Sequence, residues 1–361
     1  EKSLYWFAYN VGKRGITLNI ETADGRDIFQ RLVKTADFVI ESFTPGHMDE
    51  LGLGYKALSA LNPRLIMASI TPFGQTGPKA KDKACDLTSW ASGGALYCAG
   101  DPDRPPVQLS FPQAYLHAAA RAALGSLIAL YHRGQDGEGQ QVDVSIQESV
   151  MAVLMDAPEM WDLNRFVFRR KGYGLVHPSR GIRQRFGVPC KDGYASIYMM
   201  GGAPGVILEH MKEMVRWMDE EGMAPDWLKD LDWISDYDSA KVSQETIDRV
   251  EEAFINFLMT KTKADLSDAV IPKRLVMAPI LDAKDLAIHP QLAERDYWAK
   301  VEHPELGEAI TYCGPFAKLN QAPIEIQRPP PLIGEHNMEV YEQELGFSRS
   351  QLSALKSAGV I

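Results

Sequence analysis

The sequence predicts a doubly wound, Rossmann-like α/β large domain followed by a smaller α+β domain. Strand-like and helix-like segments alternate from residue 16 to residue 146, at a spacing that favours parallel βαβ units. A strand-like segment at residues 194–200 then opens a second, helix-rich region. Of the 361 residues, 45% are hydrophobic, which is enough to build large cores.

The first part of the alternation reads strand, helix, strand, helix, strand. Residues 16–20, 37–41 and 65–70 are short apolar runs of the kind that form strands. Helices with one apolar face are expected between these runs, after Asp24 and near residues 55–61. Ligands of such domains bind at the loops that leave the carboxyl ends of the strands. We therefore expect ligand contacts at residues 41–46 and 71–78.

The clearest helix is expected over residues 114–133, where apolar side chains recur at helical spacing until Gly134. A strand over residues 142–146 and a helix through residues 150–155 follow. Residues 166–185 are rich in Arg, Gly and Tyr and show no periodicity, which indicates a crossing segment.

Two short helices are expected at the end of the chain, after the stiff connector of three prolines at residues 329–331. The resulting organisation has four parts. They are a large α/β domain (1–165), a crossing linker (166–190), a small domain (191–319) and a return segment that packs on the large domain (320–361).

Composition excludes several classes of protein. The net charge of −10 argues against nucleic acid as a partner over the whole surface. The four cysteines are far apart with no C-x-x-C pair, which fits neither a disulfide framework nor a zinc site and favours the cytoplasm. No run of about 18 apolar residues is present, so we expect no membrane partner. We also expect no metal.

Local motifs lead only to a broad conclusion. The sequence contains no G-x-G-x-x-G, P-loop, H-E-x-x-H or G-x-S-x-G motif. The glycine-rich residues 201–205 are either a plain turn or a ligand loop. Lys13 and Arg14 lie beside a predicted strand, where they either contact a phosphate or form a solvated pair. These residues alone indicate an α/β protein with an anionic ligand.

Taken in order, the motifs of this chain resemble those of the family III CoA-transferases, which include formyl-CoA:oxalate and carnitine CoA-transferases. The resemblance covers essentially the whole chain, and its specificity comes from the number of motifs in the right order. The matching motifs are Asn10-x-x-Lys13-Arg14-Gly-Ile-Thr-Leu18, Glu41-Ser-Phe-x-Pro-Gly46, Leu51-Gly-Leu-Gly-Tyr55, Pro72-Phe-Gly-Gln-x-Gly-Pro78, Gly137-x-Gly-Gln-x-Val-Asp-Val144, Met277-Ala-Pro279 and Pro331-Leu-Ile-Gly-Glu-His336.

The resemblance implies an interlocked dimer that moves CoA from an acyl-CoA to a carboxylic acid, with CoA as substrate and no permanently bound cofactor. Family members carry a strand–helix–strand of roughly 50 to 60 residues ahead of the Asn-x-x-Lys-Arg motif, about one βαβ unit by length. We expect that unit to be missing here. In the family, an Asp at the start of the long helix attacks the thioester and forms a mixed anhydride.

Counting back from Gly137 along the long helix places Tyr115 at the position of that Asp. No Asp or Glu occurs between Asp103 and Asp136. A phenol with an ordinary pKa of about 10 is mostly neutral at pH 7, and an aryl ester could not replace the anhydride. The resemblance therefore predicts that the nucleophile is absent. We expect the nearby Asp86 to support the site rather than to attack.

The resemblance also assigns CoA contacts. Family positions that contact CoA correspond to Lys13, Arg14, Leu18, Ser42, Phe43, Leu51 and Lys83. Their alternative interpretation is that the apolar ones are core residues and the cations are solvated. Glu50 stands where many relatives have an Arg that contacts the CoA phosphates, and its charge would oppose them.

Three functions remain open at this point. In the first, the chain is a non-catalytic subunit paired with a homologous subunit that carries the Asp. Heteromeric family members have such subunits, and one of these enzymes acts in the anaerobic degradation of an aromatic compound. Alternatively, it is an active homodimeric transferase with an unusual nucleophile such as Asp86. The third alternative is an acyl-CoA racemase, but those enzymes have His where Cys85 stands and need the Asp that Tyr115 replaces.

Overall fold

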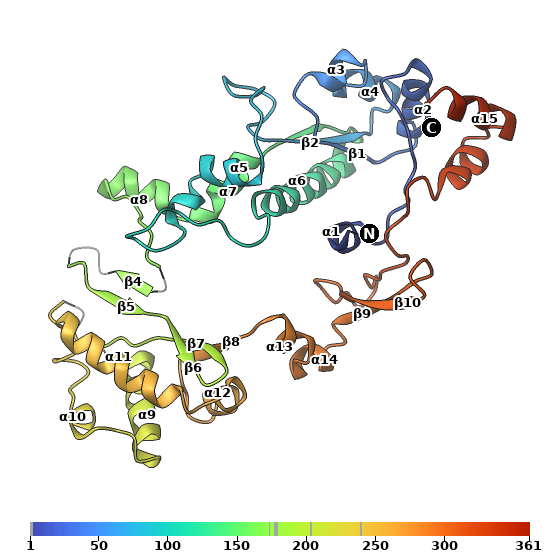
Figure 1. The fold of residues 1–361 in the computed structure, drawn as a ribbon. Coiled ribbons are helices and arrows are strands. Elements are labelled where there is room, and N and C mark those ends of the chain that lie inside the picture. Colours follow the sequence, from blue (N-terminus) through green and yellow to red (C-terminus); the bar gives the residue numbers. More distant parts are fainter. Residues whose placement is uncertain (1–2, 173, 177–179, 203, 239) are drawn as a thin grey trace. The chain divides into compact units, whose positions relative to one another are not determined.

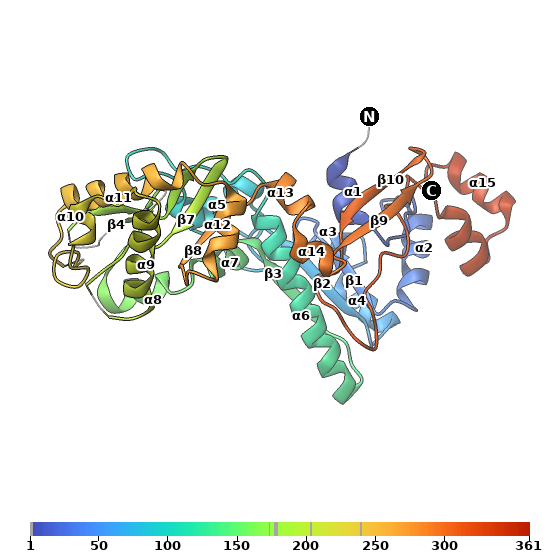
Figure 2. The same cartoon turned by 90° about the horizontal axis from the view of Figure 1, so that it is seen from below.

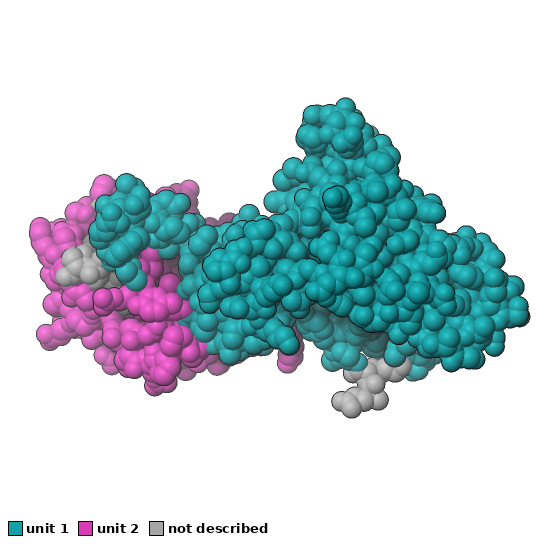
Figure 3. Space-filling model, turned by 90° about the horizontal axis from the view of Figure 1, so that it is seen from above, with its two compact units in different colours: residues 1–96, 108–167, 291–361 teal, residues 97–107, 168–290 magenta. Residues whose placement is uncertain are grey.

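A computed structural model describes residues 3–172, 174–176, 180–202, 204–238 and 240–361. The chain divides into two compact units, coloured separately in Figure 3. Unit 1 comprises residues 1–96, 108–167 and 291–361, and unit 2 comprises residues 97–107 and 168–290. Residues 291–319, which the sequence analysis assigned to the small domain, therefore belong to unit 1.

Unit 1 is built on a parallel sheet with the strand order β1–β2–β3. Its strands are β1 (Phe38–Glu41), β2 (Ile66–Thr71) and β3 (Gln141–Ser145). The central strand β2 pairs with β1 through Phe38 and Ile66 and with β3 through Ala68 and Val142. A parallel sheet with a buried central strand is typical of α/β domains. The α/β prediction is confirmed.

Helices cover both faces of this sheet (Figure 1). Met67 of β2 packs into a core formed with the helices on one face, whereas Ile70 packs against the core beneath the long helix α6 on the other. Side chains three residues apart on a strand point to opposite faces, so the two cores are separate. The helices are α2 (Ala23–Val33), α3 (His47–Glu50) and α4 (Tyr55–Leu61) on the first face, and α5 (Asp86–Ser92), α6 (Ala114–Asp136) and α7 (Ile146–Met151) on the second.

The prediction of a strand at residues 16–20 is wrong, because this segment joins no sheet among the described residues. Its backbone groups bond to the carboxyl-terminal part of the chain instead. The Thr17 N–H donates to Asn337 Oδ1 (2.9 Å), and the Asn19 N–H donates to the Val360 carbonyl (2.8 Å). The Tyr341 hydroxyl donates to the Thr17 carbonyl (2.5 Å).

The last part of unit 1 contains the two expected helices, although the first is a π-helix. An antiparallel hairpin precedes them and lies beside the first helix of the chain (Figure 2). Phe7 of that helix contacts His303 of the hairpin, with ring centroids 4.7 Å apart. The remaining elements of unit 1 are α1 (Leu4–Asn10), the 3-10 helix η2 (Ala152–Leu154), α8 (Ala157–Asn164), β9 (Trp298–His303), β10 (Glu308–Cys313), the π-helix η3 (Met338–Glu344) and α15 (Arg349–Ser357). The 3-10 helix η1 (Ala95–Cys98) and α14 (Pro290–Glu294) lie at the unit boundaries.

Unit 2 packs helices on a three-stranded antiparallel sheet with the order β6–β7–β8. Within residues 166–185, predicted as a crossing segment, the short strands β4 and β5 pair antiparallel. Gly202 forms a turn before α9 and donates its N–H to the Trp233 carbonyl (2.8 Å), while residue 203 lies outside the described residues. The elements are β4 (Gly174–Val176), β5 (Arg183–Arg185), β6 (Gly187–Cys190), β7 (Gly193–Ile197), α9 (Val206–Glu220), α10 (Asp226–Lys229), α11 (Gln244–Leu258), α12 (Lys263–Val270), β8 (Met277–Ile280) and α13 (Ala283–Ala287).

Within the described parts of the chain, no helix is both long enough and apolar enough to cross a membrane.

Candidate active site at the start of helix α6

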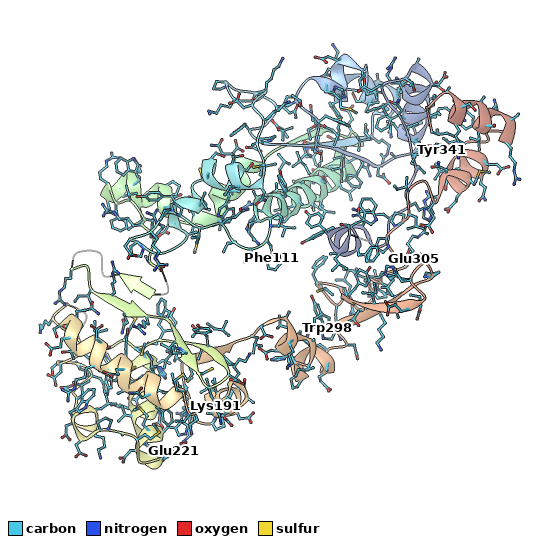
Figure 4. The ribbon with its side chains drawn as sticks, viewed as in Figure 1. Phe111, Lys191, Glu221, Trp298, Glu305 and Tyr341 are labelled. Atoms are coloured by element: carbon cyan, nitrogen blue, oxygen red, sulfur yellow. The ribbon has the colours of Figure 1, made fainter. Side chains whose placement is uncertain are left out.

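The start of α6 is the position at which the resemblance predicts the site. Helix α6 begins at Ala114, so Tyr115 is its second residue. The first backbone N–H groups of a helix have no partner within the helix and carry a partial positive charge. The Tyr115 side chain is 40% exposed beside these groups. Figure 4 labels Phe111, which lies in the segment that leads into this helix end.

The carboxylate of Asp86 caps this helix. Its Oδ2 accepts a hydrogen bond from the Gln113 N–H (3.2 Å), and its Oδ1 accepts one from the Tyr115 N–H (3.1 Å). Asp86 is buried at the start of α5. Both oxygens are therefore already bonded to the backbone of the helix, which favours a supporting role for this carboxylate.

The environment of Tyr115 opposes ionisation of its phenol. Burial raises the pKa of Tyr115 above its ordinary value, and the nearby Cys85 and Asp86 raise this pKa further. Tyr5 of α1 adds to the same effect. At neutral pH the side chain is thus a neutral phenol, which is a weak nucleophile.

Cys85 is a feature of the site that sequence reasoning did not select as functional. It is the N-terminal cap of α5 and is exposed. Hydrogen bonds from Thr88 lower the pKa of the Cys85 thiol. The larger effect comes from the Thr88 backbone and the smaller from its hydroxyl, which lies 3.6 Å from the sulfur. A Cys before an Asp with a Thr three residues later was the available sequence signal.

The predicted CoA contacts at the carboxyl end of β1 are accessible. Ser42 and Phe43 follow the last residue of β1, and both are exposed. The Phe43 ring contacts the His47 ring, with centroids 5.0 Å apart. Glu50, whose charge is predicted to oppose the CoA phosphates, is exposed at the end of α3.

Of the other predicted CoA residues, some are hydrogen-bonded or packed within the chain and one is exposed. Arg14 donates to Glu339 (2.7 Å) and Glu344 (2.5 Å), and these hydrogen bonds raise its pKa, so both carboxylates would compete with a phosphate. Lys13 donates to the Tyr9 carbonyl (2.9 Å). The last three positions are Leu18, which packs in the core with η3 and α15, Leu51, which packs in the core under α2–α4, and Lys83, which is exposed.

The loop at residues 72–78, predicted to contact ligand, is held by β3. Asp143 accepts hydrogen bonds from the Gln75 N–H at both carboxylate oxygens (3.1 and 3.0 Å). The carboxyl ends of β2 and β3 are adjacent in the sheet, because Thr71 pairs with Ser145. This geometry keeps the loop at the edge of the sheet where α/β domains bind ligands.

Elsewhere in unit 1, a cavity of about 730 Å³ is lined by residues of η3 and α15 together with Thr17. Among its lining residues are the cations Arg349 and Lys356. The predicted CoA residue Leu18 packs against the core that contains Tyr341 and Leu352, which also line this cavity. Across the described ranges, His, Cys, Asp and Glu side chains form no group of three that could hold a metal ion.

Comparison with known proteins identifies the family. The sequence profile of CoA-transferase family III matches residues 1–337. This chain belongs to CoA-transferase family III. It is 35% identical to the succinyl-CoA:(R)-benzylsuccinate CoA-transferase subunit BbsE of Thauera aromatica, over 100% of this chain and 85% of that protein. It is 30% identical to the formyl-CoA:oxalate CoA-transferase of Streptomyces coelicolor, over 99% of this chain and 86% of that protein.

Solved structures share the fold of this family III chain. A CAIB/BAIF family protein from Brucella suis matches with a TM-score of 0.78 at 24% identity, over 95% of this chain and 84% of that one. A protein from M. tuberculosis matches with a TM-score of 0.72 at 25% identity, over 92% of this chain and 84% of that one. The predictions of the fold class and of the family are confirmed.

Proposed function

We propose that this chain is the subunit of a CoA-transferase that does not supply the nucleophile, and that a homologous partner subunit carries the catalytic Asp. The observation that supports this proposal most strongly is Tyr115 at the start of α6, with a phenol whose pKa is raised. The Asp86 carboxylate, which is bonded to this helix end, is buried and uses both oxygens as a cap.

The reaction chemistry explains why the phenol of Tyr115 cannot replace a nucleophilic carboxylate. In this type of transfer a carboxylate attacks the acyl-CoA thioester, the C–S bond breaks, and a mixed anhydride and CoA thiolate form. The thiolate then attacks the enzyme carbonyl of the anhydride and releases the first acid, which leaves a CoA thioester on the enzyme carboxylate. The second acid attacks this thioester and forms a second anhydride and CoA thiolate. The thiolate finally attacks the carbonyl of the second acid and frees the enzyme carboxylate. An aryl ester at Tyr115 has no second carbonyl that could take the CoA. The covalent steps therefore belong to the partner subunit.

The substrates of the complex are proposed from the relatives. The BbsE protein is named as a subunit of a succinyl-CoA:(R)-benzylsuccinate CoA-transferase, and its similarity extends over this whole chain. We infer that the donor is an acyl-CoA such as succinyl-CoA and the acceptor is a carboxylic acid, with (R)-benzylsuccinate as the candidate to test. Ser42, Phe43 and Lys83 are the accessible residues proposed to contact CoA.

Replacement of Tyr115 tests this function in the purified native complex. In Tyr115→Phe the ring is kept and only a hydroxyl is lost, worth about 1 kcal/mol if hydrogen-bonded. We expect the transfer rate to change by less than about fivefold. Substitution of the catalytic Asp of the partner subunit by Asn is the matched comparison, for which we expect a loss of more than about a thousandfold. A loss of that size in Tyr115→Phe would instead place the chemistry in this chain.

A further inference from the structure

His47 is a titratable side chain at the edge of the sheet where CoA contacts are proposed. It is the first residue of α3, and its ring lies beside that of Phe43, with centroids 5.0 Å apart. Phe43 is 44% exposed, and the His47 side chain is 31% exposed. Both rings are therefore accessible to a ligand at the carboxyl end of β1, where α/β domains bind their ligands.

One ring nitrogen of His47 has a partner in the chain, and the other has none among the described residues. Nε2 lies 3.2 Å from Oε1 of Glu21, whereas no described group forms a hydrogen bond with Nδ1. A protonated imidazole carries an N–H on both nitrogens. Glu21 can therefore hold the charged ring at Nε2, while the Nδ1 N–H is left to donate to a ligand.

The charged groups around His47 include two acids. Glu21 is one, and Glu50 is the other, because position i+3 of a helix shares the face of position i. Asp49, two positions after His47, lies on another side of α3. Arg26 of α2 is a permanent cation that donates to the Glu21 carbonyl (2.9 Å). Of these groups, His47 is the one whose residue type ordinarily changes charge between about pH 5 and pH 8.

CoA has the two chemical features that this pair of rings would recognise. Its adenine is a flat ring, and such bases stack on aromatic side chains like that of Phe43. Its phosphates are anions, to which a charged donor makes a stronger hydrogen bond than a neutral one. When His47 is neutral, a phosphate at this edge meets the carboxylates of Glu21 and Glu50 without that compensation. Protonation of His47 shifts this balance in favour of the phosphate.

We propose that His47 is a CoA-binding residue, whose protonated imidazole donates from Nδ1 to a phosphate of CoA while Glu21 holds the ring at Nε2. CoA therefore binds this chain more tightly at about pH 6 than at about pH 8. This inference rests on the CoA contacts of the proposed function. It does not depend on which chain carries the nucleophile, because CoA binding requires no covalent step.

Isothermal titration calorimetry of CoA with the purified full-length chain tests the proposal. The quantity to compare is the ratio of the dissociation constant of His47→Asn to that of the wild type at each pH. This ratio cancels the titration of the ribose phosphate of CoA, whose second pKa is about 6. We expect a ratio of about five to ten at about pH 6 and a ratio near one at about pH 8.

Two further variants and one truncated ligand make the result specific. His47→Arg keeps a cation at every pH, so it should bind CoA at least as tightly at pH 8 as at pH 6. His132→Asn is the matched control, because His132 is exposed on α6 and pairs with Asp136 (3.2 Å), and its ratio should stay near one at both pH values. Pantetheine lacks the phosphates and should bind the wild type and His47→Asn equally.

Three outcomes would overturn the proposal. They are a ratio that is the same at both pH values, a pH-dependent ratio that persists with pantetheine, and no CoA binding by the wild-type chain at pH 6. Each is distinct from failure of the proposed function, which would appear as loss of transfer activity in Tyr115→Phe. Circular dichroism of each variant checks that the fold is retained.

Discussion

The phenol of Tyr115 lies at the start of α6 and the thiol of Cys85 at the start of α5, and the two groups have opposite electrostatic environments. Burial and the neighbouring acidic groups raise the pKa of Tyr115, so its oxygen stays protonated. Backbone and hydroxyl hydrogen bonds from Thr88 lower the pKa of Cys85, which is exposed. Of these two side chains the thiol is thus the better nucleophile, although the family reaction uses a carboxylate.

Alkylation rates test this difference directly. Because the thiolate is the reactive form, we expect Cys85 to react with iodoacetamide at pH 7 faster than Cys98, whose pKa is raised by burial. Mass spectrometry of the labelled peptides gives both rates in one sample. Thr88→Ala should slow the reaction of Cys85 and leave that of Cys98 unchanged. Equal rates for the two thiols would show that the hydrogen bonds of Thr88 do not lower the pKa.

At the scale of elements, the cap between α5 and α6 is expected to contribute measurably to stability. Loss of a capping side chain costs about 0.5 to 2 kcal/mol, and Asp86 caps α6 with two backbone hydrogen bonds. We expect Asp86→Ala to lower the free energy of unfolding by about 1 to 2 kcal/mol in denaturant titrations. Asp82→Ala is the control, because the Asp82 side chain makes an exposed ion pair with Lys79 at 3.8 Å and caps no helix among the described residues. Equal effects of the two substitutions would refute the cap.

The elements that the sequence predicts well are those with a strong local pattern. The runs at residues 37–41 and 65–70 and the small-residue periodicity of α6 correspond to β1, β2 and α6. Residues 16–20 have the β-branched pattern of a strand, but a strand must also pair with a second strand. Here the backbone N–H groups of this segment donate to Asn337 and Val360 instead. Those partners are more than 300 residues away in sequence, so no local pattern could identify them.

The candidate site was predictable in its position but not in its contacts. Motif order placed Tyr115 at the start of the long helix, and the structure has it there. The pairing of Arg14 with Glu339 and Glu344 comes from the packing of η3 near the start of the chain, which the sequence does not encode locally. The capping of α6 by Asp86 likewise connects two elements 27 residues apart. The roles of the CoA-contacting residues remain predictions.

At the scale of the whole molecule, stability is expected to depend on pH through His210 in unit 2. This side chain is fully buried, and its Nδ1 accepts a hydrogen bond from the Val276 N–H (3.1 Å). Burial lowers the pKa of His210 to about 4. Because the unfolded chain protonates this group near its ordinary pKa of about 6.5, it binds more protons than the folded chain between these values.

Stability should therefore fall as the pH is lowered from about 6.5 to about 4, by at most about 3 kcal/mol from this group. Urea titrations at pH 7 and pH 5 measure the change. In His210→Asn, which keeps an acceptor for the Val276 N–H without a titrating group, the change over this window should be smaller. An unchanged pH dependence in this variant would show that another group is responsible. His132, which is exposed on α6, provides the control substitution.

The candidate site lies in unit 1, and unit 2 has its own core. Unit 1 contains the parallel sheet, the start of α6 and all the residues proposed to contact CoA, whereas unit 2 has a separate apolar core. The proposed function explains why a chain with Tyr115 at the start of α6 would keep the fold, because a non-catalytic subunit is still required for the structure of a larger enzyme. The decisive property is therefore which chain of the complex carries the covalent intermediate.

Hydroxylamine trapping shows most directly which chain carries the covalent intermediate. Incubation of the native complex with acyl-CoA and hydroxylamine converts an activated carboxyl group into a stable hydroxamate, and peptide mapping by mass spectrometry locates it. We predict a hydroxamate on one Asp of the homologous partner subunit, whereas this chain, including Asp86, should stay unmodified. A hydroxamate on Asp86 or any other carboxylate of this chain, or CoA transfer by this chain in the absence of a partner, would contradict it.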